Sequence, residues 1–234
     1  MFAPWGRGRT IVTSADPRDR SLAFRASPAV ATPESPVVSS PTRTAAGVIV
    51  LARHGEPALS RKISLDSAGY RRWWDVYEEG GILEGQTPPE DLLEAARRAD
   101  VIFVSTRRRA QETAVAVVAG KPVIHDSMFI EAPLPPPPLP GFIKLGPKIW
   151  GVISRTSWWF FGYHEGKETR QQAQARVSLA ARRLVEHADR GENVLLVAHG
   201  FFNQMMALEL RGLGWRCVAN NGFKYWATKR FERR

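Results

Sequence analysis

The fold of this chain is decided by one stretch of sequence, Val48-Ile49-Val50-Leu51-Ala52-Arg53-His54-Gly55-Glu56. Its uninterrupted apolar run is rich in β-branched residues and predicts a strand that is buried on both faces. The strand ends abruptly at Arg53 and His54, and Gly55 allows a sharp turn there because it has no Cβ. Ligands of open α/β sheets bind at the carboxyl ends of the strands. The stretch therefore predicts a site that contains a guanidinium group and an imidazole.

Two further segments repeat this pattern of buried strand, short turn and helix. Residues 101–105 form an apolar run that leads into a basic turn and a helix. Residues 193–198 form another run, which ends in His199-Gly200 and is followed by a helix over 201–210. Alternating strands and helices predict an α/β fold. We expect a three-layer sandwich with a mostly parallel central sheet, helices on both faces and a cap insertion.

The remaining elements follow from capping residues, apolar periodicity and turn signals. We predict further helices that begin near Asp66 or Ser67 and that cover 90–98 and 168–190, a short strand near 122–125, and a final strand at a sheet edge within 220–231.

Length and composition bound the class of protein. The 234 residues are enough for one sizeable α/β domain plus a tail. The net charge of +10 suits anionic substrates, nucleic acid or a membrane surface, and it equally suits a solvated basic surface without a partner. The single cysteine, Cys217, cannot form an internal disulfide, which favours a reducing compartment, the cytoplasm. No apolar run approaches the ~20 residues that a transmembrane helix needs, and no secretory signal is recognisable.

Residues 1–44 differ in composition from the rest of the chain. They are rich in Pro, Ser, Thr, Ala and Arg, and their sparse apolar residues show no period. This composition predicts a disordered extension, so the folded domain is expected over residues 45–234. The arginines also fit an organelle transit peptide, but Asp16, Asp19 and Glu34 argue against it. A tail or an over-early start is the favoured interpretation.

Four short motifs in this order resemble those of the histidine phosphatase superfamily, which includes the cofactor-dependent phosphoglycerate mutases. The first is Arg53-His54-Gly55, and the last is His199-Gly200. Between them, Ser105-x-x-x-Arg109-Ala110-x-Glu112-Thr113-Ala114 matches the family pattern Ser-x-x-x-Arg-Ala-x-Gln/Glu-Thr-Ala. Glu131, which follows Asp126 by five positions, matches the acidic residue that the family carries after the next strand.

The resemblance implies phosphoryl transfer through a phosphohistidine intermediate. His54 would be the nucleophile, because neutral imidazole is strongly basic near pH 7 without a metal. Arg53 and Arg109 would bind the phosphoryl oxygens through their guanidinium forks. His199 would donate to the same oxygens, best when protonated. Glu131 would protonate the leaving group and later act as base for the attacking water.

The chain departs from the family pattern in two places. Where the family commonly shows x-Thr-x-x-Asn after the first motif, this chain has Pro57 and Ser60. Ser60 can still donate a hydrogen bond to phosphate, so it is a candidate substrate-binding residue. In the mutases the acidic residue is followed by an Arg-His-Tyr-Gly-like run, whereas Ala132-Pro133-Leu134-Pro135 follows Glu131 here. This departure favours the phosphatase branch over the mutases.

Residues 132–166 form a segment rich in proline and aromatic residues. The run 132–140 contains six prolines and predicts a polyproline II arm. Residues 141–162 carry tryptophans, phenylalanines, lysines and an arginine. We interpret the segment as a cap over the site. Packing over the sheet edge is an equally good interpretation, and peripheral membrane contact through the aromatic residues and lysines is a third.

The sequence therefore predicts a metal-independent phosphomonoesterase that acts on a small phosphorylated metabolite, with no cofactor and no nucleic-acid partner. A phosphoglycerate mutase is the alternative within enzymes. A basic binding protein that keeps the fold without activity is the alternative from another class. The five histidines are scattered and show no metal-ligand spacing, so no metal site is predicted.

Overall fold

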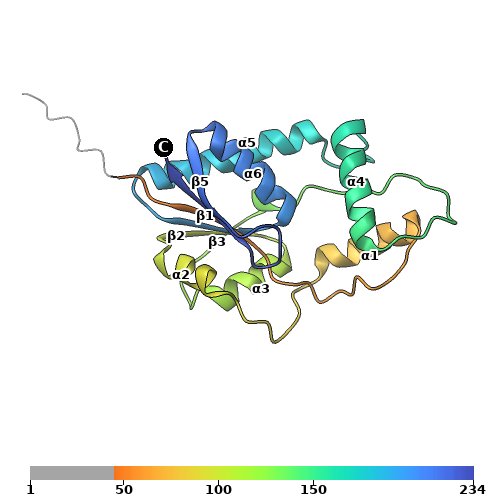
Figure 1. The fold of residues 1–234 in the computed structure, drawn as a ribbon, viewed down its shortest axis with the longest axis horizontal. Coiled ribbons are helices and arrows are strands. Elements are labelled where there is room, and N and C mark those ends of the chain that lie inside the picture. The colour runs from red at the N-terminus through yellow and green to blue at the C-terminus, as the bar shows by residue number, and fades with distance from the viewer. Residues whose placement is uncertain (1–44) are drawn as a thin grey trace, which may run out of the picture. The chain divides into compact units, whose positions relative to one another are not determined.

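The computed structural model describes residues 45–234, so the predicted extension over residues 1–44 lies outside the described residues. A six-stranded sheet with the strand order β3-β2-β4-β1-β6-β5 forms the centre (Figure 1). The strands are β1 (Ile49–Arg53), β2 (Val101–Ser105), β3 (Ile124–Asp126), β4 (Val194–Ala198), β5 (Trp215–Asn220) and β6 (Thr228–Arg233). The helices are α1 (Ser67–Glu79), α2 (Glu90–Arg98), α3 (Arg108–Val117), the short 3-10 helix η1 (Ser127–Phe129), α4 (Pro147–Phe161), α5 (Arg170–Asp189) and α6 (Gly200–Gly212).

The central strands run parallel and are buried on both faces. β4 pairs in parallel with β1 on one side and with β2 on the other, and β2 pairs in parallel with β3. Side chains alternate between the faces. Ile49 and Leu51 of β1 join the core beneath α5 and α6, whereas Ala52 joins the core beneath α2 and α3. The predicted three-layer α/β fold with a mostly parallel sheet is confirmed.

The position predicted for the last strand is wrong. β6 lies inside the sheet, antiparallel to both β1 and β5, and β5 is the edge strand on that side. β5 and β6 form a hairpin whose turn contains Gly222 at a φ of 85°. The sequence did not predict β5, because Arg216 interrupts its few apolar residues and only its pairing with β6 makes it a strand. Trp215 and Phe231 are fully buried and tie this hairpin to the core.

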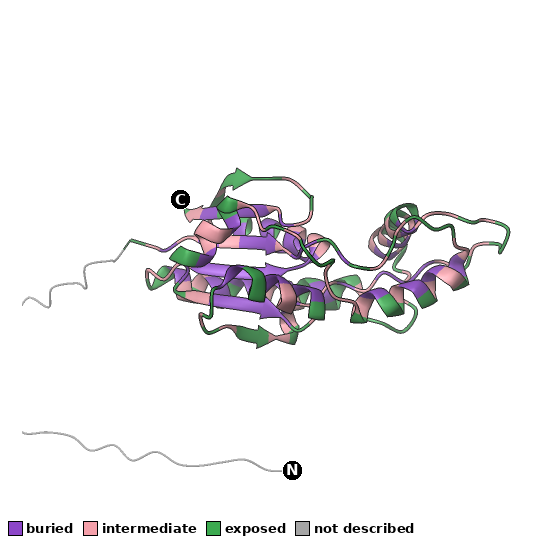
Figure 2. Ribbon diagram, turned by 90° about the horizontal axis from the view of Figure 1, so that it is seen from below, coloured by how far each residue is buried: buried purple, intermediate pink, exposed green. Residues whose placement is uncertain are grey.

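α1 and α4 pack on each other, and Trp158 of α4 also belongs to the main core. Tyr70 of α1 stacks against Trp73 of the same helix and against Trp150 of α4. These residues form a separate aromatic core together with Tyr77. Figures 1 and 2 show this helix pair beyond the carboxyl ends of the parallel strands. Among residues 45–234, no helix has both the length and the apolar content that crossing a membrane requires.

Candidate active site

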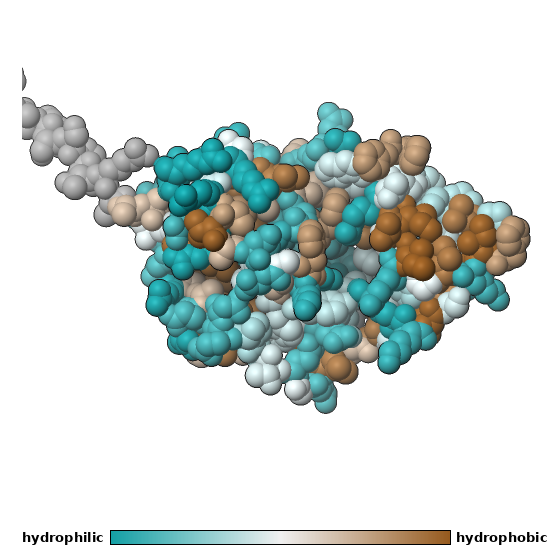
Figure 3. All heavy atoms as spheres, in the orientation of Figure 1, coloured by the Kyte–Doolittle hydropathy of each residue, from teal (hydrophilic) through white to brown (hydrophobic). Residues whose placement is uncertain are grey.

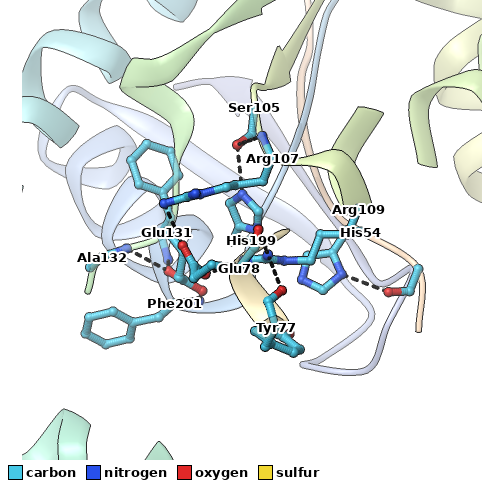
Figure 4. Close-up of polar contacts among 12 residues, drawn as sticks. His54, Tyr77, Glu78, Ser105, Arg107, Arg109, Glu131, Ala132, His199 and Phe201 are labelled. Carbon is cyan, nitrogen blue, oxygen red and sulfur yellow. Dashed lines mark hydrogen bonds and ion pairs between the residues drawn. The ribbon is translucent and has the colours of Figure 1, made fainter. Parts of the chain in front are cut away.

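The parallel sheet brings the predicted site residues together at one end. Arg53 is the last residue of β1 and His54 follows it, whereas His199 directly follows β4. Arg109 lies in the first turn of α3, just after β2. Because β1, β4 and β2 are parallel neighbours, their carboxyl ends lie side by side. Figure 4 shows His54, Arg109 and His199 gathered at this place.

His54 is buried and has a defined tautomer. Its Nδ1–H donates to the carbonyl oxygen of Gly55 at 2.8 Å, because a carbonyl oxygen can only accept. This hydrogen bond leaves a lone pair free on Nε2. Burial, with the positive charges of Arg109 and Arg53, holds the pKa of His54 well below its usual value. The imidazole is therefore neutral at pH 7, as a nucleophile must be.

His199 lies next to His54, with the two ring centroids 5.2 Å apart. Its Nε2 is 2.8 Å from the Oγ atom of Ser105, whereas its Nδ1 is buried and has no hydrogen-bond partner among the described residues. Burial and the charge of Arg109 hold the pKa of His199 well below its usual value. The ring is therefore neutral at pH 7. When the Ser105 hydroxyl donates to Nε2, the ring proton lies on Nδ1 and is available to a bound anion.

Arg109 is held in place by the end of α1. Its Nη1 donates to the carbonyl oxygens of Tyr77 and Glu78 at 3.0 and 3.2 Å, and its Nη2 donates to Oε1 of Glu78 at 2.9 Å. These contacts use three of the five N–H groups of a guanidinium. The Nε–H is buried without a partner among the described residues. Arg109 is thus positioned by Glu78, and two of its N–H groups have no hydrogen-bond partner among the described residues.

Arg53 is positioned by the chain segment that precedes β6. Its guanidinium carbon lies 4.4 Å from the centroid of the Tyr225 ring, and its Nη1 donates to the carbonyl oxygen of Phe223. A Cβ on Gly200 would lie 3.1 Å from Nε of Arg53. The glycine that begins α6 therefore leaves room for the arginine.

Gly55 fits between two other parts of the site. A Cβ at this position would lie 2.5 Å from the ring of Trp226, closer than real Cβ contacts come. The N–H of Gly55 donates to Oγ1 of Thr113 at 2.9 Å, and that hydroxyl donates to the carbonyl oxygen of Arg109 at 2.6 Å. Gly55 and Thr113 thus tie the first motif directly to the second.

Glu131 lines the same cavity as His54, and its carboxylate meets the N-terminus of α6. Oε2 accepts from the N–H of Phe201 at 3.1 Å, and Oε1 accepts from the N–H of Phe202 at 2.8 Å (Figure 4). A negative charge is favoured at a helix N-terminus. Both oxygens of Glu131 therefore accept hydrogen bonds from backbone N–H groups of α6.

A cavity of about 300 Å³ opens in front of His54, within the size range of small-molecule sites. Aromatic residues of α1 and residues of α4 form its outer wall. Its charged lining residues are five cations and one acid, namely Arg53, Arg61, Arg109, Lys148, Arg155 and Glu131. Fully buried His199 is not itself among the lining residues. Within residues 45–234, no three His, Cys, Asp or Glu side chains are grouped so that they could hold a metal ion.

Sequence reasoning missed three of these cations. Arg61 donates to the hydroxyl of Tyr77 at 3.0 Å, and Arg155 lies 4.0 Å from the centroid of the Phe201 ring. Burial lowers the pKa of Arg155, and the nearby Glu131 charge opposes that shift. Neither these arginines nor Lys148 belong to a motif. Only the interpretation of residues 132–166 as a cap pointed toward the two cations of α4.

Ser60, the candidate substrate-binding residue, lies outside the cavity lining. Its side chain is exposed, and its hydroxyl accepts from the N–H of Lys62 at 3.2 Å. The next residue, Arg61, lines the cavity instead. The proposed contact of Ser60 with substrate stays a prediction that this arrangement does not favour.

The chain is similar to several known proteins. A phosphoglycerate mutase of Schizosaccharomyces pombe is 28% identical over 193 residues, covering 74% of this chain and 83% of that protein. A mycobacterial glucosyl-3-phosphoglycerate phosphatase solved with VO3 has a TM-score of 0.50 at 19% identity, covering 79% of this chain and 90% of that one. An Entamoeba histolytica phosphoserine phosphatase has a TM-score of 0.44 at 18% identity, covering 71% and 80%. The family model of the histidine phosphatase superfamily (branch 1) matches residues 49–227, which include all four motifs, and the chain therefore belongs to that superfamily.

Proposed function

We propose that the chain is a metal-independent phosphomonoesterase that acts through a phosphohistidine at His54. One observation carries the proposal: a buried, neutral imidazole with a free Nε2 lies beside Arg53 and Arg109 in a strongly cationic cavity. Guanidinium groups that are already in place can stabilise the charge that develops on the phosphoryl oxygens. In this proposal residues 45–234 are the catalytic domain, and residues 132–166 are its cap.

The first step transfers the phosphoryl group to the enzyme. Nε2 of His54 attacks phosphorus, the P–O bond to the alcohol breaks, and the carboxyl proton of Glu131 moves to the leaving oxygen. Arg53 and Arg109 bind the equatorial oxygens, and Nδ1–H of His199 donates to one of them. The products of this step are the free alcohol, phosphohistidine and the Glu131 carboxylate.

The second step releases phosphate. A water molecule attacks phosphorus and loses a proton to the Glu131 carboxylate, and the P–N bond to His54 breaks. Inorganic phosphate leaves, and both His54 and Glu131 return to their starting protonation states. The same carboxyl group thus acts first as acid and then as base, as the reversal of roles requires.

A mutase is the second candidate, because the curated relative that matches at 28% identity is a phosphoglycerate mutase. A mutase would return the phosphoryl group from His54 to a second hydroxyl of the substrate rather than to water. The proline run after Glu131 supports the phosphatase instead, because it replaces the run that serves phosphoglycerate in the mutases. Measuring phosphate release against isomer formation with 3-phosphoglycerate separates the two activities.

Hydrolysis of p-nitrophenyl phosphate in excess EDTA tests the proposal. We expect turnover without added metal, and we expect His54→Ala to lower kcat by roughly 10³-fold or more, because the nucleophile is lost. His125→Ala is the matched control, since His125 is exposed on β3 and does not line the cavity. Phosphohistidine hydrolyses in acid, so the intermediate is trapped and measured at alkaline pH.

Three outcomes would overturn the proposal. A strict requirement for added metal would reject the mechanism, and full activity of His54→Ala would remove this histidine as the nucleophile. Failure of the wild-type chain to hydrolyse any phosphomonoester in a metabolite panel would favour the basic binding protein.

A further inference from the structure

We propose that the outward face of α4 is a docking surface for an anionic lipid membrane. We define this cap face as the exposed apolar residues of α4 and its preceding loop together with two lysines, namely Phe142, Lys144, Lys148, Ile149, Val152, Phe160 and Phe161. The proposal concerns where the protein binds, and it does not depend on the reaction proposed for the cavity.

α4 is apolar on both of its sides. Trp150 and Trp158 are fully buried on the inner side. On the outer side, Ile149, Val152 and Phe160 are 53, 66 and 73% exposed, and their spacing of three and eight residues places them on one face. Phe142 before the helix and Phe161 at its end are 84 and 80% exposed. Figure 3 shows apolar atoms gathered over α4 and the loop that leads to it.

The other helices of the described domain do not have such a face. Each of them exposes at most one large apolar residue: Val76 on α1, Val115 on α3, Leu179 on α5 and Leu208 on α6. Single exposed apolar residues are ordinary on protein surfaces, whereas a contiguous apolar patch marks an interaction site. Among the described helices, the cap face is therefore unusual in how many large apolar side chains it exposes together.

The charge of the cap identifies the occupant. No acidic residue occurs between Glu131 and Glu165, whereas Lys144 and Lys148 are exposed within this segment. Aromatic and aliphatic side chains beside lysines are the pattern of helices that lie in the membrane interface. The lysines are attracted by anionic headgroups. The apolar side chains enter the boundary between headgroups and acyl chains.

The same charge argues against two other occupants. Two copies of the chain that met through this face would bring Lys144 and Lys148 of one copy against those of the other. Residues 1–44 carry six arginines against three acidic residues, so this segment also has the same sign of charge as the cap face. An anionic lipid surface is the partner whose charge is complementary.

Docking through the cap face would also bring the cavity close to the membrane. Lys148 and Val152 belong to the cap face, and both line the cavity in front of His54. A helix of 15 residues, ~22 Å long, lying in the plane of the membrane would therefore place the cavity mouth beside the lipid headgroups.

Vesicle binding by the full chain tests this proposal. We expect co-sedimentation with vesicles of phosphatidylcholine and phosphatidylglycerol, at least 10-fold weaker binding to phosphatidylcholine alone, and loss of binding as salt is raised. The double variant Ile149→Ser/Phe160→Ser should bind the anionic vesicles at least 10-fold more weakly. The matched control Leu179→Ser/Leu208→Ser removes equally exposed apolar residues from α5 and α6 and should bind like the wild type. Neither pair lines the cavity, and thermal unfolding followed by circular dichroism reports that both variants are folded.

Three results would overturn the proposal. The first is no binding to anionic vesicles by the wild type. The second is equal loss of binding in the control pair. The third is a wild-type dimer, measured by light scattering, that Ile149→Ser/Phe160→Ser converts to monomer, because the face would then join two copies.

Discussion

Arg108 and Arg109 are neighbours in sequence with opposite surroundings. Arg108 is exposed and pairs with Glu112 one turn along α3, at 2.6 Å. Arg109 is only 1% exposed, contacts the end of α1 and lines the cavity. The motif had assigned the phosphate-binding role to Arg109 rather than to Arg108, and the burial of the two side chains now gives that assignment a physical basis.

Substitution of each arginine by lysine tests this difference. Lysine keeps the charge but loses the planar fork, so Arg109→Lys should lower kcat/KM for p-nitrophenyl phosphate by about 100-fold or more. Arg108→Lys should change it less than about 3-fold, because exposed ion pairs contribute little. Thermal unfolding of both variants shows whether Arg109→Lys is still folded. Equal losses of activity in two folded variants would contradict the role of Arg109.

The loss of activity on substituting Glu131 should depend on the leaving group of the substrate. An alkoxide needs a proton as it leaves, whereas p-nitrophenolate leaves readily without one. Glu131→Gln should therefore lower kcat at least 10-fold more for an alkyl phosphate, such as glycerol phosphate, than for p-nitrophenyl phosphate. A general loss of structure would lower both rates by the same factor. Equal losses would leave Glu131 only as a residue that positions α6.

At the scale of elements, the N-terminus of α5 makes a prediction about stability. Oγ1 of Thr169 accepts from the N–H of Gln172, and Oε1 of Gln172 accepts from the N–H of Thr169 at 2.8 Å. Thr169→Ala removes half of this capping box and should cost about 1 kcal/mol in the free energy of unfolding, measured in urea. Gln171→Ala, exposed in the same turn, should change it by less than 0.5 kcal/mol, which is roughly the usual range for surface substitutions. Similar losses in the free energy of unfolding of both variants would show that the capping box contributes no more than an ordinary surface residue.

The elements that the sequence predicted are those whose signals are local. β1, β2 and β4 are short apolar runs because both faces of each strand are buried, and each run leads directly into a motif. Arg53, His54, Arg109 and His199 could be placed together because parallel neighbours end at one edge. Their convergence follows from topology, so it required no knowledge of side-chain packing.

The contacts that sequence reasoning missed join residues that lie far apart in the sequence. Glu78 reaches Arg109 from 31 positions away, and Ser105 reaches His199 from 94 positions away. Arg61 and Arg155 enter the cavity from a loop and from α4, which carry no motif. β5 was missed for a related reason, since only its pairing with β6 makes it a strand. Pairing and packing of this kind leave no periodic mark in the sequence.

At the scale of the whole molecule, the two buried histidines make stability depend on pH. Burial lowers the pKa of both His54 and His199 in the folded chain, so below pH ~6.5 the unfolded chain binds protons that the folded chain does not. The free energy of unfolding should therefore fall as the pH drops from 7 to 5, by up to about 1.4 kcal/mol per pH unit for each histidine. Urea unfolding across this range measures the slope.

Variants separate these histidines from other titrating groups. His199→Gln removes one buried imidazole and should give a shallower slope between pH 7 and 5, whatever its effect on absolute stability. His125→Gln removes an exposed histidine and should keep the wild-type slope. A stability that stays flat or rises on acidification would contradict the neutral state of both rings in the fold.

The position of β1 has a consequence for how the protein is made. Among the described strands, β1 is the first to leave the ribosome, yet its two partners, β4 and β6, begin at residues 194 and 228. Its apolar residues and unpaired edges must therefore wait until nearly the whole domain has been synthesised. Unpaired strand edges promote association with other chains. Nascent chains halted before residue 228 should therefore bind cellular chaperones.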